Sequence, residues 1–108
     1  MKFLGLPVFT RDLNYAAKPM EHSTFRQTCE AEGFPPPKLS WTRAGKNWIL
    51  GKPLPAGRTE VEGGNLTIRN LSLADSDSYY CVATNSFGTT KTGLYMTVQP
   101  GLYFVIEY

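Results

Sequence analysis

Short runs of alternating apolar and polar residues dominate the hydrophobic pattern of this chain, and no helical stripe is present. Alternation with a period of two is typical of half-buried β-strands. In the run 25–31, for example, Phe25, Gln27, Cys29 and Ala31 share one side. The pattern predicts strands at residues 6–10, 25–31, 39–42, 66–69 and 79–83, and a last strand with Leu94, Met96 and Val98 facing inward.

Turn-forming residues separate these runs. Gly33 and the prolines at 35–37 end the second run, because proline removes a donor from the hydrogen-bond ladder. Residues 63–65 predict a turn, residues 85–88 a hairpin turn, and residues 71–77 a single short helical turn. Several short strands at near-regular spacing predict an antiparallel sandwich or barrel.

Composition then narrows the class of protein. With 108 residues, 42% of them hydrophobic and 19% charged, the chain is predicted to fold as one globular domain. The net charge of +2 is too small to indicate a nucleic-acid partner or a polybasic membrane anchor. No apolar stretch reaches the roughly 18 residues of a transmembrane helix, so we expect no direct membrane insertion.

Reactive side chains are few. Two cysteines and one histidine are too few for an all-protein zinc site, and we expect no metal and no cofactor. A serine-type catalytic constellation would depend on His22 alone, which stands between Glu21 and Ser23 with no positioned partner. We therefore interpret His22 as a surface residue, and the chain as a binding or structural module rather than an enzyme.

The two cysteines, Cys29 and Cys81, lie 52 positions apart. Two interpretations are open: unrelated buried thiols, as in a cytosolic domain, or one disulfide. A disulfide that closes so long a loop would stabilise the fold by about 4 kcal/mol through the entropy of the unfolded chain. The spacing alone does not decide between them.

The residues around the cysteines resemble the immunoglobulin sandwich. Trp41 follows Cys29 by twelve positions, and Tyr79 precedes Cys81 by two. Residues 75–81 resemble the family's Asp-Ser-Gly-x-Tyr-x-Cys element, and residues 7–10, 29–33, 65–68 and 81–88 are similar to its intermediate set (I-set). The resemblance implies an all-β, two-sheet antiparallel Greek-key sandwich at residues 6–99, with an N-terminal extension at 1–5 and an apolar C-terminal extension at 100–108.

The resemblance also implies roles for single residues. Cys29 and Cys81 would join the two sheets by a disulfide, and Tyr79 would form a tyrosine corner whose hydroxyl bonds the main chain near Leu73 or Ala74. The expected core residues are Trp41 over the disulfide, Tyr79, Leu66 and Ile68.

Arg58 and Asp75 match an ion pair of the family, and two nearby features depart from its pattern. Gln27 occupies a usually aliphatic position, so its amide must be hydrogen-bonded or the strand displaced, because an unpaired buried amide costs about 1–3 kcal/mol. Asp77 replaces a usual Gly or Ala. We expect Asp77 to be solvated or to compete with Asp75 for Arg58.

Three regions are candidates for protein contact. For three residues on a sheet face, the alternative interpretation is that single exposed apolar residues are normal on a protein surface. For the insertion at 47–52, the alternative is a lengthened strand that buries its side chains. The extension has high β-propensity, which favours pairing with a neighbouring strand or a second chain. The candidates are Tyr80, Val82 and Tyr95 on a sheet face, Trp48, Ile49 and Leu50 in an insertion at 47–52, and Leu102, Tyr103 and Phe104 in the C-terminal extension.

Surface chemistry adds two weaker signals. Asn65 and Asn70 match the N-glycosylation acceptor pattern, with Asn70 the weaker because it precedes the expected buried corner. For the basic residues in one stretch of the chain, a solvated rim is favoured over a site for a heparin-like polyanion. These residues are Lys38, Arg43, Lys46, Lys52 and Arg58.

The resemblance implies a non-catalytic protein-recognition module of a cell-surface adhesion molecule or receptor ectodomain. Its partner would be a protein, and self-association into a homodimer is a further expectation. The alternative is an intracellular module of a muscle or cytoskeletal protein that acts as a spacer or binds filaments. Oxidised cysteines indicate the first and free thiols the second.

Overall fold

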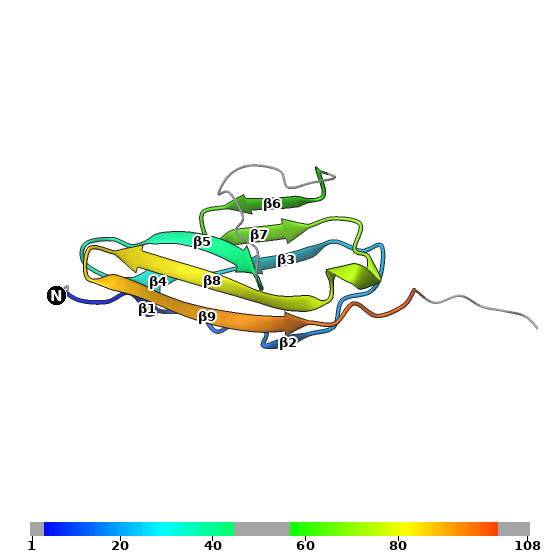
Figure 1. The fold of residues 1–108 in the computed structure, drawn as a ribbon, viewed down its shortest axis with the longest axis horizontal. Helices are drawn as coiled ribbons and strands as arrows, with labels where there is room; N and C mark the ends of the chain where they lie inside the picture. Colours follow the sequence, from blue (N-terminus) through cyan, green and yellow to red (C-terminus); the bar gives the residue numbers. More distant parts are fainter. Residues whose placement is uncertain (1–3, 45–56, 102–108) are drawn as a thin grey trace, which may run out of the picture.

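Two β-sheets packed face to face make up the fold (Figure 1). The computed structural model describes residues 4–44 and 57–101. Its strands are β1 (Val8–Phe9), β2 (Ala16–Ala17), β3 (Phe25–Thr28), β4 (Ala31–Glu32), β5 (Lys38–Arg43), β6 (Thr59–Glu62), β7 (Asn65–Ile68), β8 (Asp77–Asn85) and β9 (Gly88–Met96), with a 3-10 helix η2 at Leu73–Asp75.

The front sheet has the strand order β2-β9-β8-β5, and the back sheet has the order β3-β7-β6. All neighbours in these sheets are antiparallel except β2, which runs parallel to β9. Strands β1 and β4 form a separate, short antiparallel pair. The predicted all-β, two-sheet immunoglobulin sandwich is confirmed.

The core lies between the sheets and follows from the alternation along each strand. Trp41 on β5 faces Cys81 on β8, and Tyr79 on β8 faces Leu94 on β9. The large side chains with almost no exposed surface are Trp41, Tyr79, Leu66, Ile68, Leu71, Met96 and Val61, together with Cys29 and Cys81. Burying a large apolar side chain contributes about 1.5–3 kcal/mol, so these residues supply most of the drive to fold.

Several local expectations are refined by the structure. Gln27 is half-buried, and its amide nitrogen donates to the carbonyl of Thr28 at 3.0 Å, so the polar side chain is satisfied within its strand. The Tyr79 hydroxyl donates to the main-chain carbonyl of Asp75, one position beyond the expected Leu73 or Ala74. Ser72 caps η2, the short helix whose last residue is Asp75.

The two ends of the sandwich differ in the segments they gather. The described chain begins at one end, on the left of Figure 1, and leaves at the opposite end, where η2 also lies. Leu4 and Gly5, expected in an extension, contact the domain: Leu4 bridges to Phe34, and the Gly5 nitrogen donates to the Phe34 carbonyl at 3.4 Å. The turn between β8 and β9, closed by the pair Asn85 and Gly88, lies at this same end.

Candidate functional site

The disulfide joins the back sheet to the front sheet. Cys29 follows β3, Cys81 lies on β8, and their Cα atoms are 6.5 Å apart. The carbonyl of Gly64 accepts from the Trp41 indole nitrogen at 2.9 Å and from the Cys29 main-chain nitrogen at 2.8 Å. A Cβ at Gly64 would stand 2.0 Å from the Cys29 carbonyl oxygen, so only glycine fits there. The buried disulfide is a structural link and presents no reactive group.

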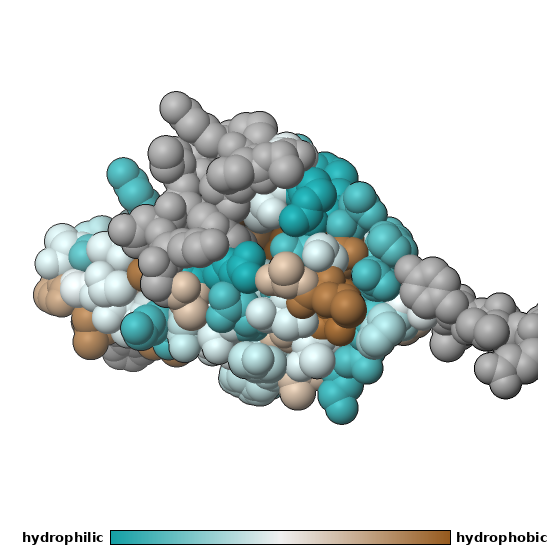
Figure 2. Space-filling view, turned by 45° about the vertical axis from the view of Figure 1, so that its right-hand side comes forward, coloured by the Kyte–Doolittle hydropathy of each residue, from teal (hydrophilic) through white to brown (hydrophobic). Residues whose placement is uncertain are grey.

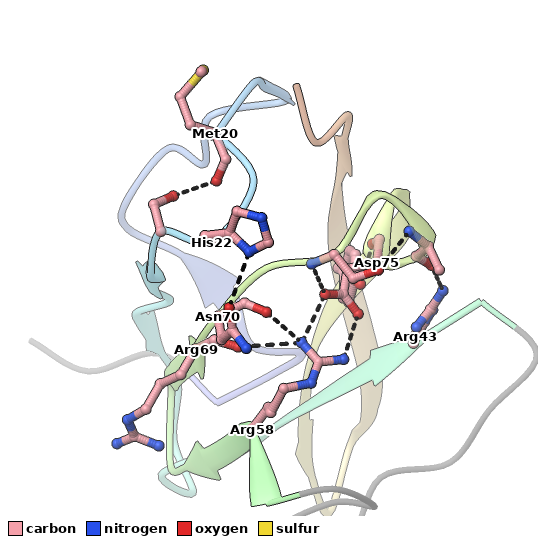
Figure 3. A network of polar contacts seen from close by, with 11 residues as sticks. Met20, His22, Arg43, Arg58, Arg69, Asn70 and Asp75 are labelled. Carbon is pink, nitrogen blue, oxygen red and sulfur yellow. Dashed lines mark hydrogen bonds and ion pairs between the residues drawn. The ribbon is translucent and has the colours of Figure 1, made fainter. Parts of the chain in front are cut away.

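A polar corner beside η2 is built on Asp75 (Figure 3). Arg58 donates to both carboxylate oxygens, at 2.9 and 3.2 Å, and the Ser72 main-chain nitrogen donates to one of them at 2.7 Å. Burial raises the pKa of Asp75, but the bonds from Arg58 and Ser72 outweigh burial and hold the pKa below its ordinary value. Asp75 is therefore a charged structural anchor at neutral pH.

Asp77 pairs with Arg43 rather than with Arg58. The Arg43 Nε donates to Asp77 at 2.8 Å, and Arg43 also donates to the Ala74 carbonyl at 2.7 Å. The Asp77 side chain is 31% exposed and is thus partly solvated, as expected, and β5 brings a separate arginine to it. Burial raises the pKa of Tyr79 to about 12, so its hydroxyl stays protonated near neutral pH.

The basic stretch does not form one positive surface in the described residues. The Arg43 and Arg58 guanidinium groups are each bound to a carboxylate, while Lys38 is exposed on β5. Lys46 and Lys52 lie outside the described residues. A site for a heparin-like polyanion loses two of its five expected cations to structural ion pairs.

His22 is exposed and has a partner that the sequence did not indicate. Its Nδ1 lies 3.3 Å from the side-chain oxygen of Asn70 (Figure 3). Its Nε2 lies 3.8 Å from the Glu21 carboxylate. Both His22 and Asn70 have positive φ angles, 70° and 49°, which mark tight turns. The contact joins two loops and contains no nucleophile.

The outer face of the front sheet carries the predicted face set. Tyr80 and Val82 are half-buried, and Tyr95 is exposed. The Tyr80 ring lies over Gly93 on the neighbouring strand, where a Cβ would come within 2.7 Å of the ring, and Lys91 Nζ stands 5.3 Å from the ring centre. This arrangement gives a flat aromatic platform beside a cation.

Charge is sparse and of one sign on that front face. Its outward strand positions within the described residues include two lysines, Lys38 and Lys91, and no carboxylate. The remaining outward positions are mostly hydroxyl-bearing, which accounts for the pale surface of intermediate hydropathy in Figure 2. Low charge with tyrosine anchors is typical of protein interfaces.

Several exposed apolar side chains gather at the end where the described chain begins. Four large side chains remain exposed there: Leu4 at 66%, Leu6 at 52%, Phe34 at 42% and Phe87 at 51%. We call these four residues the end cluster; apolar atoms are visible at this end on the left of Figure 2. Exposed apolar side chains gathered at one end of a domain make that end a candidate site for protein contact.

Asn85 holds the end cluster together. Its side-chain nitrogen donates to the carbonyls of Gly5 at 2.8 Å and Pro35 at 3.1 Å, and its oxygen accepts from the Phe87 nitrogen at 2.9 Å. One amide thus ties the N-terminal segment, the loop before β5 and the β8–β9 turn. Leu6 completes the contact by lying against Gly88.

Sequence reasoning missed the end cluster, and it placed other candidates beyond what the structure describes. Phe34 belongs to no predicted strand, and Leu4 belongs to the expected N-terminal extension. The hairpin turn at 85–88 offered one signal, because the turn itself does not require a large apolar residue such as Phe87. Trp48, Ile49, Leu50, Leu102, Tyr103 and Phe104 lie outside the described residues and stay predictions.

Comparison with known proteins decides the family. A family model described as an immunoglobulin domain matches residues 7–85. The chain belongs to the immunoglobulin domain family. The match includes both cysteines, Trp41 and Tyr79, which the structure places around the inter-sheet disulfide.

Relatives of this immunoglobulin domain include adhesion proteins. It is 34% identical over 79 residues to neural cell adhesion molecule L1 of Homo sapiens, covering 71% of this chain and 6% of that protein. It is 34% identical over 95 residues to Neuroglian of Drosophila melanogaster, covering 88% of this chain and 7% of that protein. The chain spans less than a tenth of these curated relatives, so the likeness concerns one module of each.

Solved structures show the same sandwich. The tandem Ig repeats of Dlar superpose with a TM-score of 0.76 at 28% identity, covering 93% of this immunoglobulin domain and 51% of that chain. Titin domain M7 superposes with a TM-score of 0.74 at 23% identity, covering 92% and 99%. The titin likeness shows the fold alone.

Two other kinds of site are absent from the described parts of the immunoglobulin domain. Residues 4–44 and 57–101 hold no helix long and apolar enough to cross a bilayer. The same residues hold no group of three or more His, Cys, Asp and Glu side chains arranged to bind a metal ion.

Proposed function

We propose that this immunoglobulin domain is a non-catalytic protein-recognition module of a cell-surface adhesion molecule or receptor ectodomain. The end cluster carries the proposal. This domain keeps two leucines and two phenylalanines exposed at one end, where Asn85 ties the surrounding segments together. A partner that covers this apolar surface gains a binding free energy of about 25 cal/mol for each Å² removed from water. A protein partner is the ligand that covers such a surface.

Two observations support a location outside the cell. The Cys29–Cys81 disulfide is of the type that persists in oxidising compartments. Relatives at 34% identity are named as an adhesion molecule and as Neuroglian. The alternative, an intracellular muscle or cytoskeletal module, shares the fold with titin domain M7 and differs in predicting free thiols.

We extend the proposal to homophilic contact through the end cluster. The test is sedimentation equilibrium of the whole chain over a wide concentration range, compared with the double variant Leu6→Ser/Phe87→Ser. The control is Leu73→Ser, which removes a similarly exposed apolar side chain from η2 at the opposite end. We expect the wild type and the control to self-associate and the double variant to stay monomeric.

Either of two results would contradict this extension. A wild type that is monomeric at the highest concentration leaves no homophilic contact to explain. A double variant that associates like the wild type places the contact elsewhere, for instance on the front face around Tyr80 and Tyr95.

A further inference from the structure

The back sheet carries an asparagine whose setting points to covalent modification. Asn65 begins β7, the middle strand of that sheet, directly after the Gly63–Gly64 turn. It is exposed, and the residues paired with it are Thr28 on β3 and Glu62 on β6. With Leu66 and Thr67 it completes the Asn-x-Thr acceptor pattern.

The strand geometry places the three residues of the pattern on two different faces of the sheet. Leu66 points into the core and is 1% exposed, whereas Asn65 and Thr67 lie on the outer face of the sheet. An extended backbone therefore turns the asparagine and the hydroxyl residue to the same solvent side. A group attached to Asn65 displaces no packed side chain.

A hydrogen bond orients the Asn65 amide. Thr28 Oγ1 donates to the Asn65 side-chain oxygen at 2.9 Å. This bond uses the oxygen and directs the side-chain nitrogen, the atom that carries an N-linked glycan, away from β3. The bond survives glycosylation, because the modified amide keeps its oxygen as an acceptor.

Asn70, the other acceptor pattern, is also exposed, but it lies where two loops meet rather than on a strand. Its side-chain oxygen is 3.3 Å from His22, its main-chain carbonyl accepts from Arg58 at 3.1 Å, and its φ angle is 49°. Leu71, the next residue, has no exposed surface, and the hydroxyl of Ser72 accepts from the Ala74 nitrogen in the cap of η2. A bulky glycan there stands against two loops rather than over an open strand.

We infer that Asn65 is the N-glycosylation site of this domain and that Asn70 is left unmodified. The glycan stands on the outer face of the back sheet, beside the Arg69–Glu60 ion pair. It covers that sheet with a bulky hydrophilic group and leaves the front face and the end cluster bare. The two sheets then differ in role, one shielded and one available for contact.

This inference rests on the proposed extracellular role, and the test separates the two. The full chain is produced behind a secretion leader in animal cells, with variants Asn65→Gln and Asn70→Gln. Glycan release in heavy-oxygen water marks each modified asparagine as a labelled aspartate, which peptide mass spectrometry locates. We expect the label at Asn65 in the wild type and in Asn70→Gln, and no label in Asn65→Gln.

A second pair of variants guards against loss of folding in the first. Thr67→Val removes the hydroxyl group that the acceptor pattern requires and keeps the side-chain shape. The matched control Thr67→Ser keeps the hydroxyl group and therefore the pattern. We expect Thr67→Val to abolish the glycan and Thr67→Ser to retain it, with both chains disulfide-bonded and secreted. A secreted Thr67→Val chain that still carries an N-linked glycan would show that the glycan is not attached through the Asn65–Thr67 pattern, and would overturn the inference.

A wild-type chain that is secreted and disulfide-bonded but bare at Asn65, or labelled at Asn70, would also overturn it while leaving the proposed function intact. Free thiols in protein from the native source would overturn the proposed function, whatever the secreted chain carries at Asn65.

Discussion

Replacing Asp75 by asparagine tests how the sandwich is closed at the η2 end. The carboxylate accepts three hydrogen bonds, two from Arg58 and one from the Ser72 nitrogen. Its main-chain carbonyl also accepts from Tyr79. Asp75→Asn keeps the size and one acceptor oxygen but removes the charge that the arginine faces.

The expected cost follows from these bonds. Hydrogen bonds to charged groups contribute about 1.5–3 kcal/mol each, and breaking a fully buried ion pair costs about 3–5 kcal/mol. The Arg58 side chain is 31% exposed and that of Asp75 is 9% exposed, so water solvates the arginine once its partner is gone. We therefore expect Asp75→Asn to lower the free energy of unfolding by about 2–4 kcal/mol.

Urea denaturation at several pH values measures both parts of this prediction. Because the pKa of Asp75 is lowered in the folded state, its contribution is present above the unfolded value of about 4 and is lost as pH falls through the folded pKa. The wild type should lose stability over that acidic range more steeply than Asp75→Asn, and the two curves should approach each other at low pH.

The control is Glu60→Gln, which also exchanges a carboxylate for an amide opposite an arginine. The Glu60–Arg69 pair is exposed, so we expect no change beyond experimental error. Our reasoning is refuted if Asp75→Asn is as stable as the control at neutral pH, or if the gap between it and the wild type persists unchanged through the acidic range.

Three further changes test the disulfide region, the end cluster and the tyrosine corner. Gly64→Ala should lower the free energy of unfolding by about 3 kcal/mol in urea titrations, because its Cβ would collide with the Cys29 carbonyl. Asn85→Ala should speed amide hydrogen exchange at Gly5 without changing exchange in the sheet centres. Tyr79→Phe should cost about 1–2 kcal/mol in the same titrations, since it deletes one buried hydrogen-bond donor.

The sequence predicted the parts of the fold that depend on local pattern. Alternation identified the strands around Cys29, Trp41 and Cys81, and the inward residues of β9 from Leu94 onward are buried as expected. Strand β6 was overlooked although it alternates, with Val61 inward and a glutamate on either side of it. Strand β2 has two alanines and no alternation, so only its pairing with β9 defines it.

Contacts between segments far apart in the sequence could not be predicted from the local hydrophobic pattern. Arg43 reaches Asp77 across 34 positions because β5 and β8 are neighbours, and the family pattern suggested Arg58 as the competitor instead. Asn85 reaches Gly5 across 80 positions, and nothing near either residue signals that bond. The end cluster depends on this bond, so the candidate surface emerged only from the structure.

The oxidation state of the two cysteines tests the account's central claim most directly. Protein from its native source is alkylated without reduction and after reduction, and its mass is compared. An extracellular recognition module predicts no label on Cys29 or Cys81 before reduction and two labels after it. Two labels before reduction would contradict the account and favour the intracellular alternative.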